Sequence, residues 1–73
     1  MKVLVTGAGG YIGRIVARDL AAHHQVRGVD MRPMEGLEDQ RVLDLNDYEA
    51  VCAAMDGVDG IAHLAWPMRK YEG

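Results

Sequence analysis

Glycines near the start of the chain have a spacing that could accommodate a pyrophosphate. They lie in the segment Val-Thr-Gly-Ala-Gly-Gly-Tyr-Ile-Gly, which begins at Val5. Gly7 could form a tight exit from a strand, and Gly9 or Gly10 would let backbone amides approach the phosphates. Gly13, one helical turn further on, would let a helix pack closely on that strand. The plain alternative is a tight turn that binds nothing.

The residues on either side of these glycines predict the strand and helix that a phosphate-binding turn requires. Residues 2–6 form a short apolar run, typical of a strand that is buried on both faces. Apolar residues then recur at helical spacing, at Ile12, Ile15, Val16 and Leu20. Ala17 and Ala21 would let this helix lie close against a sheet. Tyr11 and Ile12, at the helix start, would offer unpaired N–H groups to an anion.

A carboxylate follows the second predicted strand, residues 25–30. Asp30 could accept hydrogen bonds from the adenosine ribose and would repel a 2′-phosphate, which favours NAD over NADP. Arg32 could partly reverse this preference by pairing with a phosphate. Without a ligand, Asp30 would simply be a solvated strand end. Methyltransferases that use S-adenosylmethionine also have a glycine turn and an acid, but they do not need Gly13, and flavoproteins usually carry Glu instead of Asp30.

The other predicted elements complete the order β-α-β-β-α-β. Residues 31–40 are expected to be a loop, 41–43 a short strand and 61–65 a fourth strand. Asn46 and Glu49 form a predicted capping pair for a second helix. That helix would present one face formed by Tyr48, Val51, Cys52 and Met55. Alternating strands and helices predict parallel pairing with right-handed crossovers.

We therefore predict an α/β fold with a Rossmann-like parallel sheet in the strand order 3-2-1-4. One helix is expected on each face, so that the fold is an incomplete doubly wound one. Residues 1–65 would form a dinucleotide-binding half, and residues 66–73 a tail.

Composition and charge exclude several classes of function. The net charge is −3 and no basic cluster is present, whereas nucleic acids and anionic membranes attract concentrated Lys and Arg. Cys52 is the single cysteine, so no internal disulfide or cysteine metal cage can form, and we expect it to be a core residue. His23 and His24 are expected in solvent, and no histidine and carboxylate set has metal-ligand spacing. The apolar run is too short for a membrane span and charges interrupt a leader, so a cytoplasmic protein is expected.

Several segments, taken in order, resemble one family. T-G-A-G-G-Y-I-G at residues 6–13 resembles the T-G-x-x-G-x-x-G fingerprint of the extended short-chain dehydrogenases/reductases, the NAD-dependent epimerase/dehydratase family. Asp44-Leu45 resembles the family's Asp-Leu pair, which implies that both residues flank adenine. D-G-I-A-H-L-A at residues 59–65 resembles the family's D-x-V-x-H-L-A, which implies that Leu64 and Ala65 border the nicotinamide side. From its place in a buried strand, His63 is expected to be a packed, hydrogen-bonded core residue. Trp66-Pro67 departs from the family pattern.

The family's catalytic groups do not occur in this sequence. The resemblance would require a Tyr-x-x-x-Lys pair and an upstream Ser or Thr, but Tyr11, Tyr48 and Tyr71 lack the lysine, serine is absent, and the single threonine, Thr6, lies at the glycine turn. We therefore expect the NAD-binding N-terminal portion of an oxidoreductase whose substrate is a nucleotide sugar, a uronate or a related carbonyl compound. The alternatives are a non-catalytic, redox-sensing dinucleotide module and a remnant that binds nothing. An open apolar edge at residues 61–64 predicts a homodimer or other edge-strand association.

Overall fold

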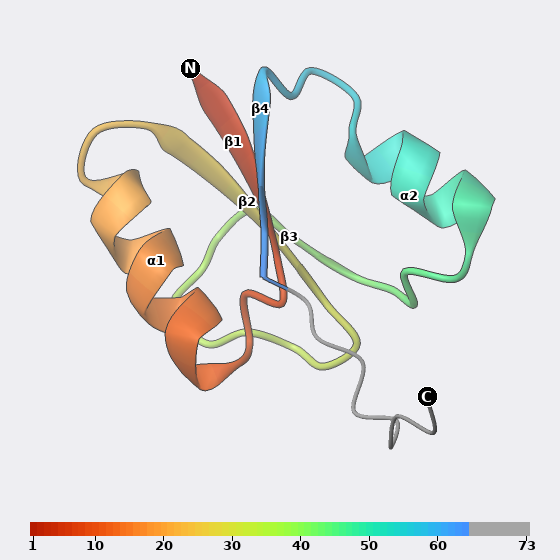
Figure 1. The fold of residues 1–73 in the computed structure, drawn as a ribbon, viewed down its shortest axis with the longest axis horizontal. Helices are drawn as coiled ribbons and strands as arrows, with labels where there is room; N and C mark the ends of the chain where they lie inside the picture. The colour runs from red at the N-terminus through yellow and green to blue at the C-terminus, as the bar shows by residue number, and fades with distance from the viewer. Residues whose placement is uncertain (65–73) are drawn as a thin grey trace, which may run out of the picture.

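The computed structural model describes residues 1–64, and the chain forms one parallel sheet with a helix on each face (Figure 1). The elements in chain order are β1 (Lys2–Thr6), α1 (Tyr11–Ala21), β2 (Gln25–Asp30), β3 (Gln40–Val42), α2 (Tyr48–Ala54) and β4 (Gly60–His63). The sheet order is β3-β2-β1-β4, and all three strand pairs are parallel. The predicted fold class and strand order are therefore confirmed. The third and fourth strands each begin one residue earlier than predicted, and the predicted end of the fourth, Ala65, lies outside the described residues.

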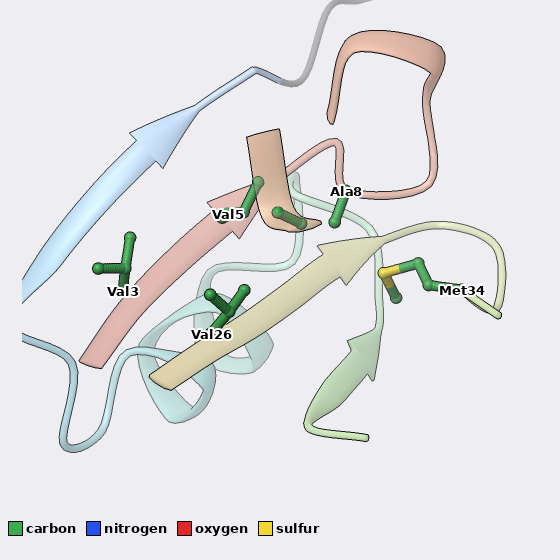
Figure 2. Packing of buried hydrophobic residues seen from close by; sticks show 6 residues of the cluster. Val3, Val5, Ala8, Val26 and Met34 are labelled. Atoms are coloured by element: carbon green, nitrogen blue, oxygen red, sulfur yellow. The ribbon is translucent and has the colours of Figure 1, made fainter. Parts of the chain in front are cut away.

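β1 is buried because it lies between β2 and β4 and is covered on both faces. On the α1 side, Val3, Val5 and Val26 form one buried cluster with Ala8, Met34 and Ala17 of the helix (Figure 2). A smaller cluster on the α2 side contains Leu4, Val29 and Ala54. Side chains alternate between the faces of a strand, so one continuous apolar run supplies both clusters.

α1 approaches the sheet through small residues, and this corrects the predicted apolar face. Gly13 and Ala17 are buried, whereas Ile12 and Ile15 are 58% and 47% exposed. A Cβ on Gly13 would overlap the carbonyl oxygen of Gly7, so a larger residue would push the helix away from the turn. The close contact therefore rotates the helix so that its smallest residues, and not its isoleucines, face the strands.

α2 differs from the prediction at its cap and on its buried face. Asp47, not Asn46, is the N-cap, and its Oδ1 accepts the N–H of Ala50 at 3.2 Å. Ala54 is the buried residue of the helix, while Tyr48 is 79% exposed and Cys52 is also exposed. The prediction that Cys52 lies in the core was wrong, because the short helix contacts the sheet through its small residues.

A buried arginine on the α2 side joins the sheet to the end of that helix. Arg27 on β2 donates through one terminal nitrogen to the carbonyl oxygens of Ala54 and Asp56, at 2.7 and 2.9 Å. Its Nε lies 3.1 Å from Oδ1 of Asp39, which also pairs with Lys2 and Arg41, each at 2.8 Å. Burial opposes ionisation of Asp39, but hydrogen bonds from Lys2 and Arg27 outweigh it and lower the pKa of Asp39 to about 2.

Within residues 1–64, no helix has the length and hydropathy needed to cross a membrane.

Candidate cofactor-binding site

The glycine turn connects β1 to α1 in the geometry that the spacing predicts. Gly7 has a φ of +71°, in the left-handed region that favours glycine. The N–H groups of Gly7 and Ala8 donate to the carbonyl oxygen of Val29, at 2.8 and 3.3 Å, which ties the turn to the end of β2. Gly10 then donates to the Gly7 carbonyl oxygen at 3.0 Å. These bonds hold the turn at the carboxyl-terminal edge of the sheet.

The start of α1 carries no side chain that would compete with an anion. Gly10 is the N-cap and offers no side-chain acceptor, and the first turn contains no acidic residue. The first-turn amides, those of Tyr11, Ile12 and Gly13, have no intrahelical acceptor by virtue of their position. This helix start therefore combines N–H groups with a partial positive charge, as an anion site requires.

Asp30 lies against the glycine turn, as the strand order predicts. Its Oδ2 accepts the N–H of Gly9 at 2.9 Å, and its Oδ1 accepts the N–H of Arg32 at 3.1 Å. The Asp30 side chain is only 12% exposed, whereas the Arg32 side chain is 76% exposed, with Nε 3.9 Å from Oδ1. The structure thus brings the Asp30 carboxylate, the long cationic side chain of Arg32 and the glycine turn to one place.

The segment after β3 reaches the same edge of the sheet. Leu43 donates its N–H to the carbonyl oxygen of Asp30 at 3.0 Å, which continues the pairing beyond β3. Asp44 follows, is exposed, and accepts the N–H of Asn46 through Oδ1 at 2.9 Å. Leu45 is 36% exposed. Both residues are therefore accessible beside the end of β2, where ligands bind in open parallel sheets.

The end of β4 is joined to the end of β1 by a side-chain contact that the sequence reasoning did not identify. Oγ1 of Thr6 lies 2.6 Å from Nδ1 of His63 and accepts the N–H of Leu64 at 3.0 Å. His63 is hydrogen-bonded as expected, but it is exposed, because β4 is the outer strand beside β1 in the described sheet. The predicted order 3-2-1-4 places the ends of these two strands side by side, but the pairing of Thr6 with His63 follows from the register that the structure shows. Leu64 is half-buried, and Ala65, Trp66 and Pro67 lie outside the described residues.

The other features of the described chain do not form a better candidate site. No group of His, Cys, Asp and Glu in residues 1–64 could hold a metal ion. A wide, open hollow lined by Lys2, His24 and Asp59 among others lies at the amino-terminal end of the strands. It is at the opposite end of the sheet from the glycine turn, so we place the candidate site at the turn.

Comparisons with known sequences agree with this geometry. The sequence profile of the NAD dependent epimerase/dehydratase family matches residues 3–71. The chain is 41% identical over 64 residues to L-arabinose 1-dehydrogenase (NAD(P)(+)) of Haloferax volcanii, covering 88% of this chain and 25% of that protein. It is 42% identical over 80 residues to cinnamoyl-CoA reductase 2 of Arabidopsis thaliana, covering 90% of this chain and 24% of that protein. The chain therefore spans about a quarter of the length of these relatives.

Solved structures have the same fold. A short-chain dehydrogenase/reductase superfamily protein from Agrobacterium tumefaciens with bound NAD superposes with a TM-score of 0.89 at 34% identity, covering 99% of this chain and 22% of that one. Uronate dehydrogenase from Agrobacterium tumefaciens superposes with a TM-score of 0.79 at 39% identity, covering 86% of this chain and 25% of that one. MoeE5 in complex with UDP-glucose and NAD superposes with a TM-score of 0.78 at 33% identity, covering 89% of this chain and 22% of that one. With the family match extending over nearly the whole sequence, the chain belongs to the NAD-dependent epimerase/dehydratase family.

Proposed function

We propose that the chain binds NAD at the carboxyl-terminal edge of its sheet, as the cofactor-binding part of an oxidoreductase. The observation that carries this proposal is the 2.9 Å hydrogen bond from the Gly9 amide to Oδ2 of Asp30. It joins the acid after β2 to the glycine turn, and in dinucleotide-binding folds these two features hold the ribose and the pyrophosphate. A solved relative with 34% identity contains NAD, which supports the same cofactor here.

The residues present fit this cofactor. A side chain at Gly13 would collide with the turn, and a capping side chain is missing at Gly10, so backbone amides stay accessible at the helix start. In the proposal, Gly7, Gly10 and Gly13 shape the pyrophosphate site with the amides of Tyr11 and Ile12, and Asp30 holds the adenosine ribose. Asp44 and Leu45 flank adenine, and Leu64 and Ala65 border the nicotinamide side. NAD, when bound, would accept or donate the hydride in the reaction.

We propose NAD in preference to NADP because the carboxylate of Asp30 would repel a 2′-phosphate. Arg32 works against this preference, since its exposed guanidinium lies beside Asp30 and could pair with such a phosphate. The Haloferax relative is named for both cofactors.

For the substrate we propose a sugar-type compound: a nucleotide sugar, a uronate or a related carbonyl compound. An arabinose dehydrogenase, a uronate dehydrogenase and a protein in complex with UDP-glucose support this class, whereas cinnamoyl-CoA reductase 2 does not. The acid–base pair Tyr-x-x-x-Lys is missing from the sequence. We therefore propose that residues 1–65 form the dinucleotide-binding half, that residues 66–73 lead onward, and that other parts of a longer polypeptide supply catalysis.

Calorimetric titration of the 73-residue chain with NAD tests the cofactor proposal. Gly10→Val would place a branched side chain where phosphates must approach, while its Cβ would meet the Gly7 carbonyl oxygen at an ordinary 3.4 Å. We expect binding to weaken by at least about tenfold in this variant. Gly60→Ala, whose Cβ would lie 3.7 Å from Sδ of Met1, is the matched control and should bind as the original chain does. Equal NAD affinity in all three proteins would contradict the proposal.

A second candidate is a non-catalytic dinucleotide-binding module that senses redox state. The observation in its favour is the combination of a complete glycine turn with no serine and no Tyr-x-x-x-Lys in the sequence. The intact mass of the native protein distinguishes the two. A mass several times the 8.0 kDa of this chain supports the enzyme, and a mass of 8.0 kDa supports the module.

A further inference from the structure

Gly9 is the residue at which the glycine turn touches the carboxylate of Asp30. Its N–H donates to Oδ2 at 2.9 Å, and a Cβ placed on Gly9 would lie 3.0 Å from both Cγ and Oδ2 of Asp30. Such a contact is tighter than the packing of ordinary side chains, so the carboxylate would have to shift by a few tenths of an ångström. Gly9 does not have a positive φ, so its backbone conformation is open to alanine as well. The demand for glycine at this position therefore comes from Asp30 and not from the turn.

The position of the Asp30 carboxylate determines which of its lone pairs remain available. An ionised carboxylate has about four acceptor sites on its two oxygens. The Gly9 amide uses one site on Oδ2, and the Arg32 amide uses one site on Oδ1 at 3.1 Å. One site on each oxygen is left, which matches the two hydroxyl groups of a ribose. The two amides thus orient the carboxylate for a diol.

We propose that Gly9 is a specificity-determining residue, because its missing side chain lets Asp30 lie against the turn and present both oxygens to the adenosine ribose. This inference rests on the proposed function, in which Asp30 holds that ribose. A methyl group at residue 9 would push the carboxylate out of this position, which weakens its hydrogen bonds to the ribose of NAD. It would also move the negative charge away from the place where a 2′-phosphate of NADP would lie.

A double-mutant cycle tests the coupling between the two residues. Gly9→Ala in the original chain should weaken NAD binding by about tenfold, as expected for the loss of hydrogen bonds to a charged group. NADP binding should stay within about twofold, because the loss of contacts is offset by weaker repulsion. Asp30→Ala removes Cγ and Oδ2 and leaves only the Cβ, which lies at an ordinary 3.5 Å from the added methyl group. In that background, Gly9→Ala should have no further effect on either cofactor.

A measurement without ligand separates this inference from the proposed function. Three-bond couplings in NMR spectra of the isotope-labelled chain report the χ1 rotamer of Asp30. We expect Gly9→Ala to change the Asp30 couplings and Gly60→Ala to preserve them. Unchanged Asp30 couplings, or a loss of NAD affinity that persists in the Asp30→Ala background, would overturn the inference. If the original chain binds neither cofactor, the proposed function fails, and the couplings still decide whether Gly9 orients Asp30.

Discussion

The hydroxyl oxygen of Thr6 lies 2.6 Å from Nδ1 of His63, at the point where β1 and β4 end side by side. The same oxygen accepts the N–H of Leu64 at 3.0 Å, and the Thr6 carbonyl oxygen lies 3.1 Å from that nitrogen. A single threonine therefore holds the outer strand at the edge where the candidate site lies. Thr6 itself is buried, with 4% of its surface exposed.

Replacing this hydroxyl should loosen the end of β4. Thr6→Val keeps the shape of the side chain but removes the partner of His63 and one of the two acceptors of the Leu64 N–H, which keeps the Thr6 carbonyl oxygen. We expect the free energy of unfolding to fall by about 0.5–1.5 kcal/mol, the usual net contribution of a hydrogen bond. Urea denaturation measures the change. Thr6→Ser retains the hydroxyl and is the control, and a serine variant as unstable as the valine variant would show that the hydroxyl is unimportant.

Arg27 should contribute more to stability than any exposed charge. Arg27→Met removes the donor that the Ala54 and Asp56 carbonyl oxygens share, as well as one of the partners of Asp39. We expect a loss of about 2–3 kcal/mol, since the buried Ala54 carbonyl group, the part-buried Asp56 carbonyl group and a carboxylate lose a charged partner. Arg41→Met is the matched control, because Arg41 pairs with the same carboxylate at the surface and should cost less than about 1 kcal/mol. Similar losses for the two variants in urea denaturation would contradict this ranking.

The low pKa of Asp39 predicts how stability changes in acid. Because folding lowers this pKa from 3.8 to about 2, the ionised carboxylate stabilises the folded state above pH 3.8. That contribution should be lost as the pH falls through about 2. Asp39→Asn cannot ionise, so the difference in unfolding free energy between the original chain and this variant should be large near pH 5 and shrink toward about pH 2. A difference that does not depend on pH would show that Asp39 is not the titrating group.

Arg32 should affect NADP more than NAD. Its side chain is 76% exposed and close to Asp30, so it can swing toward a 2′-phosphate without disturbing the fold. We expect Arg32→Ala to weaken NADP binding severalfold, on the order of one lost ion pair at the surface, and to leave NAD binding within about twofold. Parallel calorimetric titrations measure both. Arg18→Ala, on the exposed side of α1, is the control, and an equal loss for the two cofactors would exclude a role in discrimination.

The unpaired edge of β4 should make the chain associate with other chains. Ile61 is 51% exposed on the strand beside β1, and within the described sheet β4 pairs on one side only. Open strand edges with apolar side chains pair with other chains, and a charged residue suppresses this pairing. We expect sedimentation velocity to show dimers or larger species that diminish in Ile61→Lys. Tyr48→Lys, which changes an exposed residue on α2, controls for charge alone. A compact monomer at high concentration would exclude the association.

Local patterns in the sequence were sufficient to predict the fold class and the strand order. Each of three signals can be recognised from residues that are close together in the sequence: the apolar run of β1, the helical spacing of α1 and the acid that ends β2. Each of these elements occurs where it is expected. Parallel strands with right-handed crossovers then leave few possible orders, so that Asp30 and the glycine turn had to meet. The family fingerprint depends on the same local residues.

The burial and the partners of individual side chains were decided by the tertiary structure. Rotation of α1 about its axis buries Gly13 and exposes Ile12, and no periodicity in the helix alone reveals that rotation. Arg27 finds its acceptors 27 and 29 residues further along the chain, which no local pattern can indicate. The sequence by itself determined the order of the strands and the position of the glycine turn, because these follow from short-range propensities and chain geometry. Only the tertiary structure decided that Gly9 touches Asp30 and that Thr6 holds His63, because such contacts depend on how separate elements pack in three dimensions.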